Sequence, residues 1–327
     1  METDNATASN SQASPSAAGL VRISESVVVV TPNYLKNQPK YLAPKYMCGL
    51  ANQKKLMDGH ILVPLKAANH YAHKGGKNTL QRMLYFYGPR GSGKHLYVRS
   101  FCGKYNVNLI TLDFARFDPL RDLELVYATA LEYQPCIVLY DQCEGYFRHN
   151  SERRIVGKLL GELQSVRDSH SLIWSIFISE VPPMPEMCHT IVEMLNQYAF
   201  CGMLTDRDRL KVLTQAIAAK LHRDIDFPLN ETSLLYLANA AEHCTPQQIH
   251  NYIGRVFHTK LIALQLSNLA TLDPTDESLV PSVDDFKSEL IDIGNGKAAR
   301  ITRTDPFQMN IAPYPEVSQT GAYGFKG

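Results

Sequence analysis

The most constraining feature of this 327-residue sequence is the glycine-rich segment Gly88–His95, which reads GPRGSGKH. It follows an apolar run, Met83–Tyr87, that predicts a buried strand, and it leads into a segment of helical character, Lys94–Tyr105. A strand, a glycine-rich turn and a helix form the context of a phosphate-binding loop, where backbone N–H groups and the helix N-terminus face an anion. The segment therefore predicts a phosphate site at the end of a strand.

The last two residues of this segment give different indications: the first favours phosphate binding and the second disfavours Mg²⁺ binding. Lys94 occupies the position from which a lysine reaches the outer phosphates of a nucleotide, so we expect ATP or ADP as the ligand. The pattern G-x-x-x-x-G-K-[ST] then requires a hydroxyl for Mg²⁺, but His95 stands there. Imidazole is a poor ligand for an ion that prefers hard oxygens, so we expect weakened Mg²⁺ binding. The alternative is that Lys94 is a remnant in an empty loop.

Composition excludes several classes of protein. The net charge is +1 and the isoelectric point is near 7.6, which argues against nucleic acid or an anionic membrane as the main partner. The seven cysteines include no C-x-x-C pair, which argues against a zinc site and fits reduced thiols. The sequence has no signal-peptide pattern and no apolar run of about 18 residues, so we expect no membrane span. We expect a cytoplasmic location, with the nucleus or cytoskeleton as alternatives.

The pattern along the chain predicts an α/β fold with a parallel sheet sandwiched by helices, followed by a small all-α lid domain. Between residues 41 and 204, apolar strands alternate with helical segments, which is typical of a parallel sheet covered on both faces. The predicted strands are Met83–Tyr87, Val107–Leu112, Cys136–Asp141 and Leu172–Ile178. Residues 205–293 show helical patterns only. We expect residues 1–40 to be a disordered tail, apart from an edge strand at Val27–Val30, and residues 294–327 to be extended.

Four motifs over about residues 46–293 resemble the AAA-type P-loop ATPases, most closely the branch that contains katanin, spastin and fidgetin. They are Gly49-Leu50 followed by Ile61–Lys66, the loop Gly88–His95, the strand Gln134–Asp141, which is similar to the family's Q-P-S-I-I-F-I-D, and Cys244–Ile249, which is similar to Y-S-G-x-D-I in the helical lid. Together these matches define a P-loop AAA module.

The resemblance implies a set of site residues. The nucleotide-binding residues are Gly49, Leu50, Gly88, Pro89, Arg90, Gly91, Ser92, Gly93, Lys94, His95 and Leu96, with Asp141 as the metal-binding acid. In the family, the Gly-Leu pair lies near the adenine and the acid at the strand end holds the metal. The alternative for Asp141 is a helix-capping role. The pair Arg153-Arg154 follows as the family's paired arginines do, and belongs either to a subunit interface or to an exposed helix face.

The catalytic positions depart from the family pattern. The family's strand ends in Asp-Glu, where the Glu polarises the attacking water, but Gln142 stands there and an amide cannot accept that proton. Glu144, two residues further on, is no reliable substitute. The family's next strand ends in an Asn that orients the water, and Ser179-Glu180 occupy that place. We therefore assign no catalytic residue.

Two further family elements are absent from the sequence. No Arg or Lys occurs between Arg167 and Arg207, so the arginine fingers that complete a neighbouring subunit's site are missing. The segment Asp113–Asp122 lacks the aromatic-Val-Gly pore loop that grips a translocating polypeptide. Losing a general base costs about 10²–10⁴-fold in rate, and losing an arginine finger costs about 10³–10⁵-fold.

These departures favour an AAA-like ATP-binding protein with weak or absent hydrolysis. We expect it to act as a scaffold or regulatory subunit through protein–protein contacts, with a related AAA subunit or a cytoskeletal assembly as partner. The cytoskeletal partner rests on analogy between folds. The alternative is an active AAA ATPase of the microtubule-severing or protein-remodelling type with unusual catalytic residues.

Overall fold

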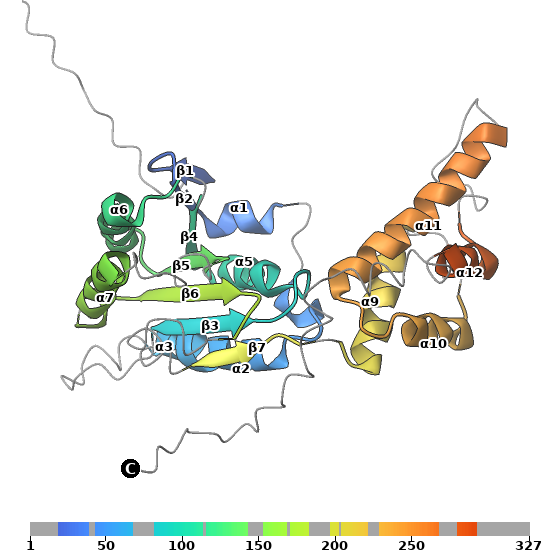
Figure 1. Cartoon of the computed structure of the whole chain (residues 1–327), viewed down its shortest axis with the longest axis horizontal. Helices are drawn as coiled ribbons and strands as arrows, with labels where there is room; N and C mark the ends of the chain where they lie inside the picture. Colours follow the sequence, from blue (N-terminus) through green and yellow to red (C-terminus); the bar gives the residue numbers. More distant parts are fainter. Residues whose placement is uncertain are drawn as a thin grey trace, which may run out of the picture. The chain divides into compact units, whose positions relative to one another are not determined.

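The computed structural model describes residues 19–38, 43–67, 82–113, 116–142, 153–168, 171–182, 197–202, 204–221, 229–267 and 280–292. The chain divides between Gly202 and Met203 into two compact units, which are described separately. The first unit contains the sheet, and the second contains only helices within the described residues (Figure 1).

A mixed sheet of seven strands forms the centre of the first unit within its described residues. The strands are β1 (Leu20–Arg22), β2 (Val27–Val30), β3 (Met83–Tyr87), β4 (Asn108–Leu112), β5 (Cys136–Asp141), β6 (Ile173–Ser179) and β7 (Tyr198–Phe200). Their order across the sheet is β1-β2-β4-β5-β6-β3-β7. The β1–β2 and β2–β4 pairs are antiparallel, whereas β4, β5, β6, β3 and β7 run parallel. The carboxyl ends of the parallel strands meet at one edge, and the glycine-rich loop begins there.

Helices pack on both faces of the sheet, as the alternation of strands and helices predicts. The helices among the described residues of this unit are α1 (Pro32–Lys36), α2 (Ala51–Met57), the π-helical turn η2 (Asp58–Leu62), α3 (Val63–Lys66), α5 (Lys94–Tyr105), α6 (Pro119–Glu132) and α7 (Arg153–Asp168), with a 3₁₀ turn, η1, at Pro44–Tyr46. Along β6, Trp174, Ile176 and Ile178 belong to the apolar core that also contains residues of α1, α2 and α5. Ser175 points to the opposite face, where its hydroxyl lies 2.9 Å from that of Tyr127 on α6. Strand β6 is therefore buried on both faces, as expected for a parallel strand covered by helices on either side.

The segment after α2 departs from regular helix at Asp58–Leu62, and a proline accounts for part of this departure. Pro64 has no N–H, so it cannot donate to the carbonyl of His60, four residues earlier. The indole N–H of Trp174, which is buried, donates to this carbonyl at 2.9 Å. The π-helical turn is thereby fixed to the sheet.

The expectation of a disordered tail over residues 1–40 was wrong for residues 19–38. There the chain forms β1, β2 and α1, and β1 lies at the sheet edge while Val27–Val30 pairs on both sides. The reason is burial, because Val27 and Val29 are fully buried. The helix that follows has a capping hydroxyl from Thr31 and a proline in its first turn. Residues 1–18 and 294–327 lie outside the described residues.

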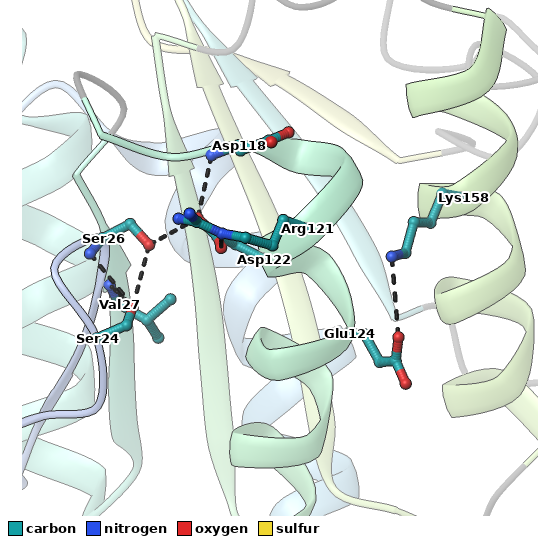
Figure 2. A network of polar contacts seen from close by, with 8 residues as sticks. All are labelled: Ser24, Ser26, Val27, Asp118, Arg121, Asp122, Glu124 and Lys158. Atoms are coloured by element: carbon teal, nitrogen blue, oxygen red, sulfur yellow. Dashed lines mark hydrogen bonds and ion pairs between the residues drawn. The ribbon is translucent and has the colours of Figure 1, made fainter.

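A buried carboxylate fixes this N-terminal hairpin to helix α6 (Figure 2). Asp122 accepts hydrogen bonds from the Ser26 hydroxyl at 2.9 Å and the Asp118 N–H at 3.0 Å, and its other oxygen accepts from Arg121 at 2.6 Å. The backbone N–H of Asp113 in turn donates to the carbonyl of Ser26 at 2.8 Å. The hydrogen bond from Arg121, assisted by the other two donors, lowers the pKa of Asp122 to about 2.

The second unit consists of helices in its described residues: α9 (Asp206–Ala218), α10 (Glu231–Ala240), α11 (Pro246–Ser267) and α12 (Val283–Asp292). Asn230 caps α10 and Ser282 caps α12, since each side chain accepts from the backbone N–H three residues later. Thr205 caps α9 in the same way, with its hydroxyl accepting from the N–H of Asp208. Of the helices described in either unit, none has the length and apolarity needed to cross a membrane.

Replacing Asp122 with Asn tests the hairpin anchor. The variant loses a charge-assisted hydrogen-bonding group at a buried site, so we expect the free energy of unfolding at pH 7 to fall by about 1–3 kcal/mol. Because folding lowers the pKa of Asp122 from 3.8 to about 2, its contribution is complete above pH 4 and is lost as the pH falls towards 2. Denaturant melts at pH 7 and pH 2 measure both effects.

Glu124→Gln is the matched control, since Glu124 is an exposed carboxylate on the same helix, 3.9 Å from Lys158 (Figure 2). A surface pair of this kind contributes little, so we expect a change below about 1 kcal/mol. Equal stability of Asp122→Asn and the wild type at pH 7 would show that the network does not hold the hairpin.

Candidate nucleotide-binding site

The glycine-rich loop between β3 and α5 has a backbone that only glycine adopts readily. The φ angles of Gly88, Gly91 and Gly93 are 141°, 76° and 94°. At Gly88 there is also no space for a side chain, because a Cβ atom would lie 2.3 Å from the carbonyl oxygen of Cys201. The N–H of Cys201 donates to the carbonyl of Tyr87 at 2.7 Å. The residue after β7 therefore packs directly against the start of the loop.

Lys94, the first residue of α5, lies inside the loop. Its side chain is buried, and Nζ donates to the carbonyls of Gly88 at 2.7 Å and Pro89 at 2.9 Å, with the Ser92 hydroxyl at 3.3 Å. These partners hold the ammonium group where a phosphate-binding loop encloses its anion. Leu96, in the first turn of α5, packs against the apolar core.

The predicted adenine-side residues lie beside the end of the loop. Gly49 has a φ of 72°, and Leu50 after it is buried and precedes α2. A Cβ atom at Gly93 would have Met47 Cε at 3.4 Å and Leu50 Cδ1 at 3.6 Å. The structure therefore brings together the Gly49-Leu50 pair and the glycine-rich loop, which are separated in the sequence.

Gln53 connects these two segments and was missed in the sequence analysis. It is fully buried, and its Nε2 donates to the carbonyl of Lys94 at 3.1 Å. Its Oε1 accepts from the thiol of Cys201 at 3.3 Å. One amide thus joins α2, α5 and the residue after β7. The available signal was the helical spacing of Leu50, Gln53 and Met57, which places Gln53 on the buried face.

The end of β5 carries the predicted metal-binding acid and the residue in place of the catalytic base. Asp141 is partly exposed, and its Oδ1 accepts from the N–H of Gln142 at 3.0 Å. Gln142 is exposed and has a φ of 55°, which is uncommon for a residue other than glycine. Burial lowers the pKa of His95, while the charge of Asp141 acts in the opposite direction and that of Arg99 adds to the lowering. His95 is therefore uncharged at neutral pH, within the electrostatic range of Asp141.

The end of β6 lies beside the end of β3, since Ser179 is paired with Tyr87 in the sheet. Ser179 is buried, and its hydroxyl accepts from the N–H of Val181 at 3.1 Å. The next side chain, Glu180, forms an ion pair with the Nε of Arg90 in the glycine-rich loop. The sequence analysis named both residues but not their contact, which joins positions 90 residues apart.

Some predicted features lie beyond what the structure describes. Glu144 and the segment 183–196 fall outside the described residues. For Arg153 and Arg154 the backbone is part of α7, but nothing is described of their side chains.

Comparison with known families gives a match to one part of the chain. Residues 84–193 match the sequence model of the AAA family, the ATPase family associated with various cellular activities. Together with the sheet topology, this match supports an AAA-type domain in that part of the chain, as the motifs indicated.

Solved structures support the same fold. The chain superposes on the FIGL-1 AAA domain in complex with ADP with a TM-score of 0.63 and 14% identity, covering 86% of this chain and 93% of that one. A structure from a study of katanin self-assembly gives a TM-score of 0.60 and 15% identity, covering 80% of this chain and 87% of that one. At these identities the likeness concerns the fold.

Curated relatives include two fungal peroxisomal ATPases, both named PEX6. The protein of Penicillium chrysogenum is 22% identical over 196 residues, which are 54% of this chain and 13% of that protein. The protein of Arthrobotrys oligospora is 24% identical over 213 residues, which are 59% of this chain and 18% of that protein. The chain thus spans less than a fifth of the length of these relatives.

Substituting Gly88 with Ala tests the geometry of the loop. The added methyl group would meet the Cys201 carbonyl at 2.3 Å in a backbone conformation with φ of 141°. We expect the variant to lose about 1–3 kcal/mol of stability, measured by thermal or denaturant unfolding.

Gly157→Ala is the control, because Gly157 lies on α7 with nothing within 4 Å of the added atom. Alanine is the better helix former, so this variant should be unchanged or more stable by up to about 1 kcal/mol. If Gly88→Ala behaved like Gly157→Ala, the close approach of Cys201 to the loop would be wrong.

Proposed function

We propose that this protein is an AAA-like ATP-binding protein with weak or absent ATP hydrolysis, which acts as a scaffold or regulatory subunit through protein–protein contacts. One observation carries the proposal. The buried ammonium of Lys94 is held inside a complete glycine-rich loop, while the residue after Asp141, where the family places its water-activating Glu, is the amide of Gln142.

The geometry of the loop supports ATP or ADP as the ligand. The left-handed glycines turn the backbone, and Lys94 supplies one positive charge at the centre of the loop. The carbonyls of Gly88 and Pro89 accept hydrogen bonds from this ammonium group. Phosphate oxygens are stronger partners for an ammonium group than neutral carbonyls, so a nucleotide can replace them. The FIGL-1 AAA domain, which has the same fold, forms a complex with ADP.

Mg²⁺ fits this site poorly. The ion prefers oxygen ligands in near-octahedral geometry, and the predicted metal position offers the carboxylate of Asp141 and the imidazole of His95. When bound, Mg²⁺ would neutralise charge on the phosphates. Asp141 is the residue that would hold it, and His95 contributes no hard oxygen. We therefore propose that nucleotide binding depends little on Mg²⁺.

Weak hydrolysis follows from the groups around Gln142. An amide cannot take a proton from water, and loss of a general base alone costs about 10²–10⁴-fold in rate. The second candidate function, an active ATPase, is favoured by the carboxylate of Glu180 at the neighbouring strand end. That carboxylate forms an ion pair with Arg90, which occupies it and lowers its availability as a base.

The partner is proposed to be another protein. Katanin self-assembles, and a related AAA subunit could present its own arginines to the nucleotide of this chain. A second copy of this chain could not do so, because the sequence has no Arg or Lys between Arg167 and Arg207. A cytoskeletal assembly is the other partner we propose, and a cytoplasmic location suits both. The PEX6 relatives are peroxisomal ATPases, which makes a peroxisome-associated complex an alternative.

Thermal melts with nucleotide test the proposed binding. We expect ATP or ADP at about 100 times Kd to stabilise the wild type by about 2.7 kcal/mol, with or without Mg²⁺. Lys94→Ala should remove most of this nucleotide-dependent shift, because it removes the charge inside the loop. Lys104→Ala, at the exposed far end of the same helix, should retain it.

The comparison uses the shift caused by nucleotide, so any change in the basal stability of a variant cancels. Equal shifts in Lys94→Ala and Lys104→Ala would contradict binding at this loop. The absence of a shift in the wild type would contradict nucleotide binding altogether.

A further inference from the structure

The ion pair between Arg90 and Glu180 places a carboxylate at the glycine-rich loop. Glu180 follows Ser179, which is paired with Tyr87, so its backbone lies beside the first residues of the loop. The side chain of Glu180 is 18% exposed, whereas that of Arg90 is 76% exposed. The acid is thus set against the loop, and the arginine reaches it from the solvent side.

A carboxylate at the position of Glu180 affects the binding of the terminal phosphate of a nucleotide more than the binding of the inner phosphates. The loop backbone encloses the inner phosphates, and the terminal phosphate extends beyond it towards the strand ends. Two acids stand at those ends: Asp141 at β5 and Glu180 beyond β6, on strands that are hydrogen-bonded neighbours. A diphosphate leaves this space unfilled, but a triphosphate brings additional negative charge into it.

The described cations do little to offset these acids. Lys94 lies within the loop, from where a lysine reaches the outer phosphates, so its charge is available to the last phosphate of a diphosphate and to that of a triphosphate. Arg90 is engaged by Glu180, so a terminal phosphate must compete with an existing carboxylate for the guanidinium. The predicted metal position has His95 in place of a hydroxyl, so Mg²⁺ would bind weakly and neutralise little of the negative charge there.

We infer that Glu180 makes this site select nucleoside diphosphates over nucleoside triphosphates. The inference rests on the proposed nucleotide binding and adds the preferred ligand class. Glu180 acts as an internal anion that holds Arg90 and repels a terminal phosphate. Two like unit charges about 12 Å apart interact by about 1.4 kcal/mol where the effective dielectric constant is about 20, which corresponds to a tenfold change in Kd, and a closer approach gives a larger change.

Titration calorimetry of the full chain with ADP and with ATP, both in EDTA, tests the inference. The wild type should bind ADP about tenfold more tightly than ATP. Glu180→Gln should tighten ATP binding by about tenfold and leave the Kd for ADP within about twofold, because it removes a charge near the terminal phosphate only. Arg90→Gln should widen the preference for ADP, since it leaves the acid without its partner.

Glu132→Gln is the matched control for the loss of one negative charge. Glu132 is exposed at the end of α6 that leads into the start of β5, on the opposite edge of the sheet from the loop. This variant should keep the wild-type ratio of the two Kd values. A thermal melt of each variant without nucleotide establishes that it is folded.

The outcomes separate this inference from the proposed function. If ADP and ATP bind the wild type equally, or if Glu180→Gln leaves their ratio unchanged, the inference is overturned while nucleotide binding stands. If neither nucleotide binds the wild type, the proposed function fails and the inference fails with it. A tightening of ATP binding confined to Glu180→Gln, with Glu132→Gln unchanged, supports the inference.

Discussion

The site depends on the close approach of two backbone segments, Gly88 after β3 and Cys201 after β7. A single added carbon at Gly88 would lie 2.3 Å from the Cys201 carbonyl oxygen, so the contact requires glycine. It fixes where the loop leaves the sheet, and Gln53 extends the same contact to α2 and to the carbonyl of Lys94. The position of the buried ammonium group therefore follows from packing and hydrogen bonds among strand ends.

The residues around that loop match the family pattern only in part. The groups that enclose an anion are in place, whereas those that act on water or on a terminal phosphate differ from the family pattern. Gln142 supplies an amide in a left-handed conformation, and Glu180 supplies a carboxylate where the family has an amide. Compared with the family pattern, the end of β5 therefore carries one carboxylate fewer and the end of β6 carries one more. These differences are the physical basis of our proposal that the site binds a nucleotide with weak or absent hydrolysis.

Much of the fold was predictable from the sequence because its strands are buried on both faces. The α/β class is confirmed, and the predicted strand Cys136–Asp141 has the bounds of β5. Val27–Val30 was predicted only as an edge strand, whereas β1 and helix α1 were not predicted, since their order comes from contacts distant in sequence. The anchor between Ser26 and Asp122 spans 96 residues, and no local pattern indicates it.

Some residues of the candidate site were also predictable from the sequence, and others were not. The glycines and Lys94 were predictable, because a phosphate-binding loop imposes fixed residue types at fixed spacing. The role of Gln53 and the pairing of Arg90 with Glu180 depend on which strand ends become neighbours, so only the folded sheet defines them.

We propose that the site retains nucleotide with weak or absent hydrolysis. A single-turnover experiment tests this most directly: the purified full chain, in excess over labelled ATP and above its Kd, is quenched over several hours with Mg²⁺ present. A Lys94→Ala preparation measures contaminating activity. We expect ATP bound to the wild type to be recovered largely unchanged at every time point, at the level of the Lys94→Ala sample. Conversion of the bound ATP to ADP within seconds, as for enzymes that turn over about once per second or faster, would contradict it.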